Sequence, residues 1–166
     1  ESTDVNAHKA TQRAAVVTTR RQGLTTAQVG DLSATQIKGL TTAQIGDLAT
    51  TQIAALSTTQ IAAIEVADVA KLAITQLNQM VTTQIEALHA KQSAALTSTQ
   101  ISGMGTTQVG YLGATQIAAI EAADVASMTA AQLNKLVTTQ LNALNAKQMG
   151  ALTTTQIGSL DATPIT

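Results

Sequence analysis

The sequence predicts an all-α solenoid in which each eight-residue repeat, or octad, forms one short capped helix. Gln fills 16 of the 21 positions reached by stepping in eights from Asp4; we call these the Gln positions. An apolar residue follows the Gln position in 18 of 21 octads, and another stands four residues after it in 19 of 20. Ser or Thr recurs three residues before the Gln, which is the spacing of a helical capping box. Such short units are stable only when stacked, as in a solenoid.

The segment 1–22 is expected to consist of degenerate repeats that cap the array. Its Gln positions include Asp4 and Arg20, and Arg13 and Arg21 stand where other octads carry an apolar residue. Polar terminal repeats are typical of solenoids. Residues 23–166 are expected to form one octad-repeat domain. Because the chain begins at Glu1 without Met, we expect a processed chain or an excerpt from a longer one.

Beyond residue 23, the capping boxes predict where the helices begin. A hydroxyl at the first residue and the Gln amide at the fourth would satisfy two backbone N–H groups. The pairs are Thr25/Gln28, Ser33/Gln36, Thr41/Gln44, Ser57/Gln60, Thr97/Gln100, Thr129/Gln132 and Thr153/Gln156. Where Thr is displaced by one, as in Val81-Thr82-Thr83-Gln84, we expect the cap to shift with it.

The residues after each Gln predict how the helices pack. Ile and Leu three residues apart share one helix face. Eight of the ten Gly residues lie between these two apolar positions, which favours close approach of neighbouring helices and suits a helix C-terminus.

Other conformations fit the octad less well. Eight residues rotate a continuous helix by about 80° per octad relative to whole turns, so no apolar stripe would persist. In a strand, Ile and Leu three residues apart would point to opposite faces. A β-solenoid that buries both faces remains the alternative.

A longer repeat overlies the octad. The block that starts at residue 61 recurs from residue 117, seven octads later, which indicates duplication. Between residues 23 and 51 the details alternate every second octad, as in Gly23, Asp31, Gly39 and Asp47. This alternation favours two octads per solenoid turn, whereas an odd duplication of seven octads argues against it.

The composition of the chain argues against several classes of function. Aromatic residues make up 1% of the chain, too few for an ordinary core of large rings. A net charge of −1 with 11% charged residues argues against nucleic-acid binding, and no apolar run is long enough to span a membrane. With no Cys, the chain has no disulfide, thiolate metal site or cysteine nucleophile.

Two acidic pairs are the only repeated candidates for chemistry. Glu65/Asp68 and Glu121/Asp124 have the same spacing of three, but neither pair has a His or a further acid at a repeated spacing. We expect these carboxylates to lie in the first turn of a helix, where they favour its dipole.

Further polar residues give no site. His8 and His89 stand alone, Lys91 and Lys147 occupy equivalent places in a duplicated Ala-Lys-Gln, and Gly103-Met104-Gly105 lacks the Lys and strand of a phosphate loop. We therefore predict no catalytic, cofactor-binding or metal-binding residue, and no enzyme.

Units such as Leu40-Thr41-Thr42-Ala43-Gln44-Ile45 and Leu56-Ser57-Thr58-Thr59-Gln60-Ile61-Ala62-Ala63 resemble the L-T-T-x-Q-[IV]-x-x arrays of long bacterial surface or secreted repeat proteins. The resemblance covers nearly the whole chain. It implies a stalk, adhesin or filament segment at the cell surface or outside the cell, with no catalytic residue.

Two expectations concern partners. The apolar residues Ile157 and Leu160 near the C-terminus predict end-to-end association with another copy or with flanking repeats. The alternative function is a binding module with a flat Thr-rich face, for ice or another ordered surface. No small-molecule substrate and no nucleic acid are expected.

Overall fold

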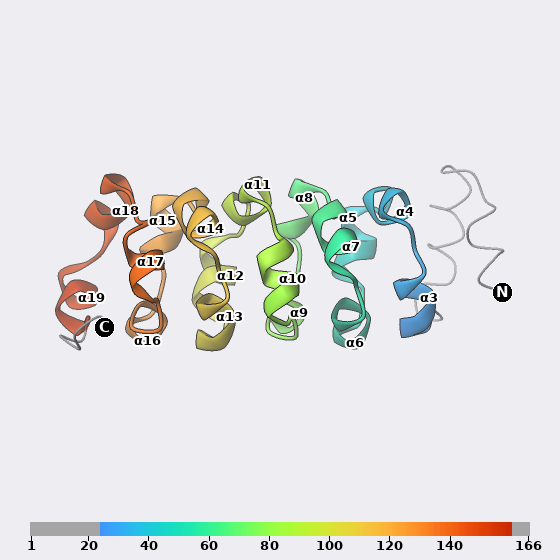
Figure 1. Cartoon of the computed structure of the whole chain (residues 1–166), viewed down its shortest axis with the longest axis horizontal. Helices are drawn as coiled ribbons and strands as arrows, with labels where there is room; N and C mark the ends of the chain where they lie inside the picture. Colours follow the sequence, from blue (N-terminus) through green and yellow to red (C-terminus); the bar gives the residue numbers. More distant parts are fainter. Residues whose placement is uncertain (1–23, 161–166) are drawn as a thin grey trace. The chain divides into compact units, whose positions relative to one another are not determined.

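The computed structural model describes residues 24–160, which form 17 α-helices, α3–α19, and no strand (Figure 1). Each helix has four to six residues, and consecutive helices start about one octad apart. The prediction of an all-α solenoid with one capped helix per octad is confirmed, and the β-solenoid alternative is wrong for these residues. The predicted cap at residues 1–22 lies outside the described residues.

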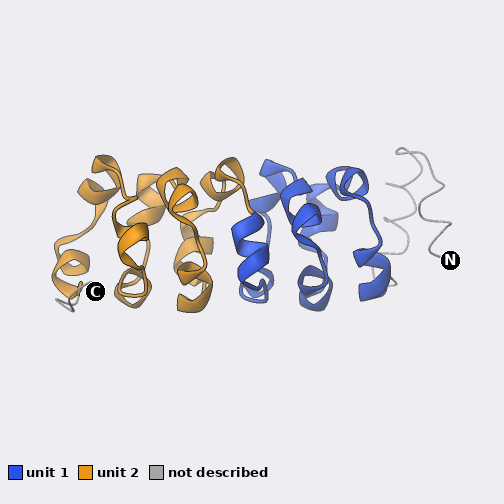
Figure 2. Cartoon of the chain, in the orientation of Figure 1, with its two compact units in different colours: residues 1–87 blue, residues 88–166 orange. Residues whose placement is uncertain are grey.

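The chain divides into two compact units, residues 1–87 and 88–166 (Figure 2). The helices of the first are α3 (Thr26–Gly30), α4 (Ala34–Lys38), α5 (Thr42–Gly46), α6 (Thr50–Ala54), α7 (Thr58–Ala63), α8 (Val66–Val69), α9 (Ile74–Leu77) and α10 (Thr82–Ala87). Those of the second are α11 (Ala90–Ala94), α12 (Ser98–Gly103), α13 (Thr106–Gly110), α14 (Ala114–Ala119), α15 (Ala122–Val125), α16 (Ala130–Leu133), α17 (Thr138–Leu141), α18 (Ala146–Ala151) and α19 (Thr154–Ser159). The single domain 23–166 and the blocks from 61 and 117 stay predictions.

The capping box starts the helices where the sequence predicts. At α7, the Ser57 hydroxyl accepts a hydrogen bond from the Gln60 backbone N–H at 3.3 Å, and Gln60 Oε1 accepts one from the Ser57 N–H at 2.8 Å. Ser57 is in the extended region, at φ −71° and ψ 163°, so the chain turns into the helix directly after it. Two N–H groups that a helix start would leave unpaired are thereby satisfied.

The predicted shift of the cap in octads with a displaced Thr is wrong. Val137 is the N-cap of α17, and its N–H donates to Gln140 Oε1 at 2.7 Å. The Val81 N–H donates in the same way to Gln84, at 3.1 Å. The Gln half of the box therefore fixes the helix start even where the cap residue has no side-chain acceptor.

Both apolar columns form the core, as predicted. Ile53, directly after a Gln, is fully buried, and Leu56, four residues after the same Gln, is 3% exposed. Ser93 replaces an apolar residue in the first column and is also fully buried; its hydroxyl donates to the His89 carbonyl at 3.3 Å. That bond removes the main cost of placing a hydroxyl in the core.

Within each unit, helices pack against the helix that follows three later in the chain, so about three helices make one turn of the solenoid. Within the first unit the packed pairs are α3 with α6, α4 with α7, α5 with α8, α6 with α9 and α7 with α10. In the second unit they are α11 with α14, α12 with α15, α13 with α16, α14 with α17, α15 with α18 and α16 with α19. Partner helices are thus three octads apart in the sequence.

The favoured period of two octads per turn is therefore wrong. Asp31, Gly39 and Asp47 are the C-cap residues of three consecutive helices and are all exposed to solvent. An alternation among equivalent exposed positions is not constrained by core packing, so it need not follow the solenoid period.

Glycine serves close packing rather than a special backbone conformation. No described residue has a positive φ, so the helices do not end in the left-handed conformation that favours Gly. A Cβ at Gly46 would instead lie 3.5 Å from the Lys71 carbonyl oxygen, and one at Gly110 would lie 3.4 Å from Lys135 Cγ. Small residues here face the part of the chain that follows about three octads later.

Candidate functional site

Many of the Gln side chains have a second role in addition to capping their own helices, and Gln60 is an example. Gln60 Nε2 lies 2.9 Å from the Val29 carbonyl oxygen, 3.0 Å from that of Gly30 and 2.7 Å from that of Leu32. These carbonyl groups lie at and just beyond the C-terminal end of α3, where helical backbone acceptors lose their partners. The Gln60 amide therefore pairs with a backbone N–H at the start of α7 and with backbone carbonyl groups at the end of α3, which lies four helices earlier in the chain.

The same arrangement recurs in both units, and we call it the Gln clamp. In each clamp, the Gln Oε1 accepts a hydrogen bond from the N-cap N–H of the same octad. The Gln Nε2 donates a hydrogen bond to the backbone carbonyl of the apolar residue 28 positions earlier. The shortest Nε2 to carbonyl oxygen distances are Gln52 to Leu24 2.7 Å, Gln76 to Leu48 2.7 Å, Gln84 to Leu56 2.7 Å, Gln116 to Leu88 2.6 Å, Gln132 to Met104 2.7 Å, Gln140 to Leu112 2.5 Å and Gln156 to Met128 2.7 Å. Gln148 reaches both Ile117 and Ile120 at 2.7 Å.

Sequence reasoning missed this donor role. A capping box accepts Glu as readily as Gln, because both supply a carbonyl-type oxygen. No Gln position of the chain holds Glu. The use of Gln and never Glu at these positions is the signal that an N–H₂ donor is also needed. The burial of Gln60, at 3% exposure, is consistent with a donor that points into the array.

The two acidic pairs lie at helix starts, but only the Asp of each pair is in the first turn, where both carboxylates were predicted. Glu65 and Glu121 are the N-cap residues of α8 and α15, and Asp68 and Asp124 are in the first turns of these helices. Glu65 Oε1 lies 3.4 Å from Lys38 Nζ in a largely solvent-exposed ion pair, which contributes little.

Asp68 and Asp124 occupy Gln positions but make a different contact. The Thr42 hydroxyl donates to Asp68 Oδ1 at 2.6 Å, and the Ser98 hydroxyl donates to Asp124 Oδ1. These bonds link α8 to α5 and α15 to α12, three helices earlier, rather than to the fourth. A carboxylate has no N–H to donate, so these two octads lack the clamp.

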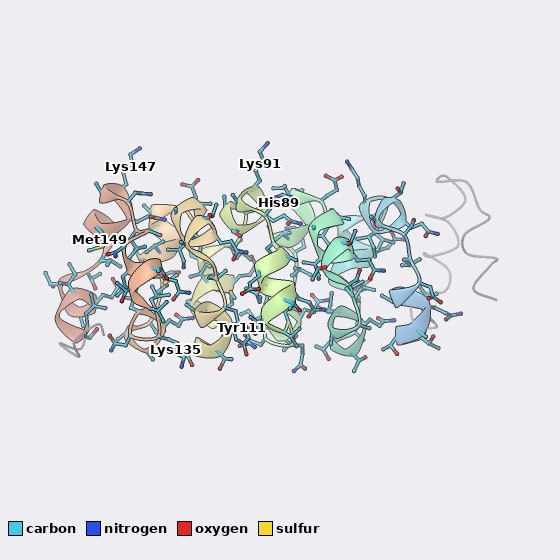
Figure 3. All side chains as sticks on the ribbon, viewed as in Figure 1. His89, Lys91, Tyr111, Lys135, Lys147 and Met149 are labelled. Carbon is cyan, nitrogen blue, oxygen red and sulfur yellow. The ribbon has the colours of Figure 1, made fainter. Side chains whose placement is uncertain are left out.

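The isolated basic residues are structural or exposed. His89 is the N-cap of α11, and its Nδ1 accepts from the Gln92 backbone N–H at 3.3 Å. Lys91 and Lys147 are exposed and point away from their helices (Figure 3). His8 lies outside the described residues. Within residues 24–160 no three His, Asp or Glu side chains come together to hold a metal ion. The absence of a metal site in the whole chain stays a prediction.

The outward Thr residues lie mainly at the second position of the helices. In the first unit Thr35, Thr59 and Thr83 belong to α4, α7 and α10, which pack in succession. In α5 and α8 the same position holds Ala43 and Ala67. The row α3, α6 and α9 holds Ala27, Thr51 and Thr75, so three successive Thr occur in one row of this unit. In the second unit Lys91 and Lys147 occupy this position in two helices.

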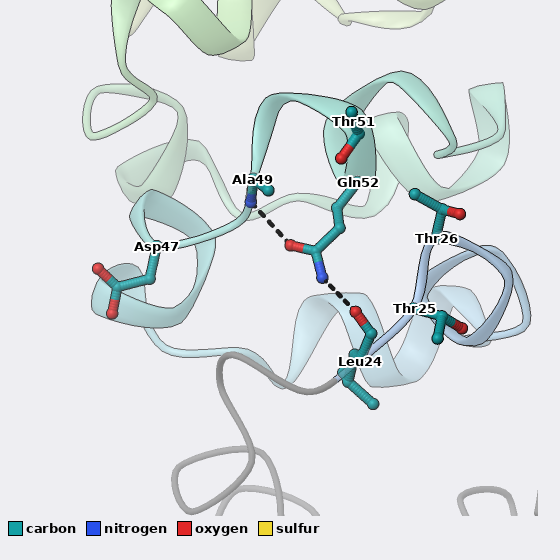
Figure 4. Close-up of a pocket in the computed structure, with 7 residues that line it drawn as sticks. All are labelled: Leu24, Thr25, Thr26, Asp47, Ala49, Thr51 and Gln52. Atoms are coloured by element: carbon teal, nitrogen blue, oxygen red, sulfur yellow. Dashed lines mark hydrogen bonds between the residues drawn. The ribbon is translucent and has the colours of Figure 1, made fainter.

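A pocket near the start of the first unit contains one Gln clamp (Figure 4). Gln52 Oε1 accepts from the Ala49 N–H at 2.7 Å, and its Nε2 donates to the Leu24 carbonyl oxygen at 2.7 Å. The lining residues are Leu24, Thr25, Thr26, Asp47, Ala49, Thr51 and Gln52. Asp47 is the one titratable group among them, so the lining offers no acid and base pair for catalysis.

These features define an α-solenoid repeat protein whose recurrent Gln residues bind its own backbone. None of the helices between residues 24 and 160 is long and apolar enough to cross a membrane.

Comparison with protein families agrees with this class. Residues 117–154 and 125–162 match the model of the ALTTAQ repeat. The two matches are offset by one octad, so the predicted resemblance to an octapeptide-repeat array is confirmed. No curated protein and no solved structure matches the chain.

Proposed function

We propose that this chain is a non-catalytic structural segment, a stalk, adhesin or filament module, of a bacterial surface or extracellular protein. The observation that supports this proposal is the Gln clamp. In most proteins with a binding or catalytic site, a few polar side chains converge on a pocket. Here the recurrent buried polar groups are paired with backbone groups of the array itself.

Uniform octads suit a spacer. Each turn buries its apolar columns against its neighbours and satisfies the helix ends of the turn before it, so length can change by adding turns without a new design. The outward positions carry mainly Thr and Ala, which give solubility without a concentrated charge. End-to-end stacking on another copy or on flanking octads would extend such a module.

Surface labelling tests the proposed location. Antibodies raised against the purified chain are applied to intact and to lysed cells of the organism that produces it. We expect intact cells to be labelled, or the chain to be recovered from the medium. Labelling that requires lysis, with none of the chain in the medium, would contradict a surface or extracellular role.

The second candidate, binding to ice or another ordered surface, is supported by the Thr35, Thr59 and Thr83 row. If that row binds ice, the chain slows ice recrystallisation and Thr59→Lys abolishes the effect, whereas Thr51→Lys on α6 does not. A chain without any effect on ice growth removes this candidate.

A further inference from the structure

Two octads of the array lack the hydrogen bonds that Gln makes elsewhere. Asp68 of α8 and Asp124 of α15, one in each unit, occupy Gln positions (Figure 1). Neither helix has a capping box, and their N-cap residues Glu65 and Glu121 make no side-chain cap hydrogen bond. An Asp side chain is one methylene shorter than that of Gln and has no N–H to donate. Fewer hydrogen bonds therefore hold the first turn of these two helices than the first turn of a clamped helix.

The contacts that replace the clamp involve the side chains and not the backbone of the helix start. The Thr42 hydroxyl donates to Asp68 Oδ1 at 2.6 Å, and the Ser98 hydroxyl donates to Asp124 Oδ1. In the second unit, the Ser127 hydroxyl adds a bond to the Ser98 carbonyl at 3.0 Å. None of these bonds pairs a backbone N–H group at the start of α8 or α15, so none of them takes the place of the capping box.

Packing does not distinguish these helices from clamped ones. Val125 of α15 and Ile117 of clamped α14 are both fully buried. Helix α15 packs against α12 and α18, and α14 packs against α11 and α17. Val69 of α8 is likewise fully buried, as is Ile53 of clamped α6. The difference therefore lies in the hydrogen bonds of the helix start and not in the core.

We propose that α8 and α15 are opening points of the array, at which the first helical turn unwinds more often than in the clamped helices before and after them. Unwinding a clamped helix start breaks the bond from the N-cap N–H to Gln Oε1 and pulls Gln Nε2 from the carbonyl groups four helices earlier. Both costs are absent at α8 and α15, so a smaller free energy opposes their local opening. In a stalk, such points would let the array extend under load before the clamped turns unfold. That use rests on the proposed function, whereas the opening itself does not.

Amide hydrogen exchange of the full-length chain, measured by NMR, tests the proposal at matched residues of the first unit. The Ile53 N–H donates to the Ala49 carbonyl at 3.0 Å, and the Val69 N–H donates to the Glu65 carbonyl at 3.2 Å. Neither N-cap residue makes a side-chain cap bond, so the pair differs chiefly in whether Gln or Asp directly precedes the buried residue. We expect the protection factor of Val69 to be at least about tenfold lower than that of Ile53.

The second unit supplies an independent pair. The Ile117 N–H donates to the Gly113 carbonyl and the Val125 N–H donates to the Glu121 carbonyl, both at 3.0 Å. Again neither N-cap residue makes a side-chain cap bond. We expect Val125 to have the lower protection factor of the two. The Ser127 bond should make this difference smaller than the difference in the first unit.

Asp68→Gln should restore the clamp. Glu65 is in the extended region, at φ −62° and ψ 145°, close to the −63° and 152° of Ala49, whose octad forms both bonds. The new amide can therefore accept from the Glu65 N–H and donate to the Leu40 carbonyl, 28 positions earlier. We expect the Val69 protection factor to rise at least about tenfold.

Asp68→Asn is the matched control. It also removes the charge and supplies an amide, but its side chain is one methylene too short to make both bonds of the clamp. The Val69 protection factor should therefore stay within about threefold of the wild-type value.

The opening points and the proposed location fail separately. Equal protection of Val69 and Ile53 in the wild type would overturn the opening points, whatever the surface-labelling result. So would a helical Asp68→Gln variant that gains no protection at Val69, or an equal gain with Asp68→Asn. If circular dichroism shows that Asp68→Gln does not fold, Gln52→Asp must lower the Ile53 protection factor at least about tenfold. An unchanged Ile53 in that variant also overturns the proposal.

Discussion

The amide of a clamp Gln serves two helices with two different atoms, so a single substitution can separate its roles. Gln60→Glu keeps an oxygen for the Ser57 N–H but replaces the donor with a second oxygen beside the carbonyl groups of Val29 and Leu32. A buried donor is lost and like partial charges meet, so we expect the free energy of unfolding to fall by about 3 kcal/mol. Urea denaturation followed by circular dichroism measures the change.

Gln28 provides the matched control for this substitution. Its Oε1 accepts from the Thr25 N–H at 2.9 Å, but its Nε2 donates to no carbonyl among the described residues. Gln28→Glu therefore keeps the capping box and removes no clamp bond, and it should change stability by less than about 0.5 kcal/mol. Equal losses at both positions would show that the clamp donor contributes nothing.

At the residue scale, the sequence predicts the capping role of Gln but not its role as a donor in the clamp. The capping box can be derived from the spacing of Thr25 and Gln28, because its two bonds are local. The clamp joins residues 28 positions apart, and that distance depends on how many helices make a turn. Spacing within the octad contains no information on this number, so the acceptors could not be identified.

Single helices in this array differ chiefly in their caps. Ala73, the N-cap of α9, has φ −68° and ψ 150°, close to the Ser57 conformation, but it has no side-chain acceptor. Ala73→Ser should therefore add the missing bond to the Gln76 N–H and stabilise the chain by about 0.5–1 kcal/mol. Thermal or urea unfolding measures the gain. Ala67→Ser, at an exposed position within α8, makes no cap and should give no gain.

The core face of a helix is expected to tolerate far less than its outward face. Ile53 of α6 is fully buried, so Ile53→Asp places an unpaired carboxylate in the core and should cost more than about 3 kcal/mol. Thr51→Ser changes an exposed residue of the same helix and should stay within about 0.5 kcal/mol. Urea denaturation compares the two. Similar effects would mean that the apolar columns are not the core.

At the element scale, helix positions and buried faces follow from local patterns, and the errors arise from contacts between helices. Asp31 and Gly39 alternate at exposed C-caps, so their pattern is unrelated to the turn. The real period is set by how Ile and Leu columns of helices three apart fit together, which is a property of packing.

Across the second unit, stability should decrease toward α18 and α19, which have no described helix three positions later to pack against. Helix α14 packs against both α11 and α17, whereas α19 packs against α16 and exposes Ile157. Amide hydrogens of residues 154–159 should exchange at least about tenfold faster than those of 114–119, because fewer contacts oppose their local opening. Hydrogen exchange with mass spectrometry resolves the two segments. Equal protection of the two segments would contradict this expected gradient.

The direction of the clamp bonds has a consequence for biosynthesis. In every clamp the donor follows its acceptor, as Gln60 follows Leu32 and Gln132 follows Met104, each by 28 positions. A ribosome releases the acceptor first, so each emerging octad meets carbonyl groups that are already in place. The nascent chain can add one helix after another without waiting for its C-terminus. A protein of this kind can be lengthened by many octads, and the folding task of each new octad stays the same.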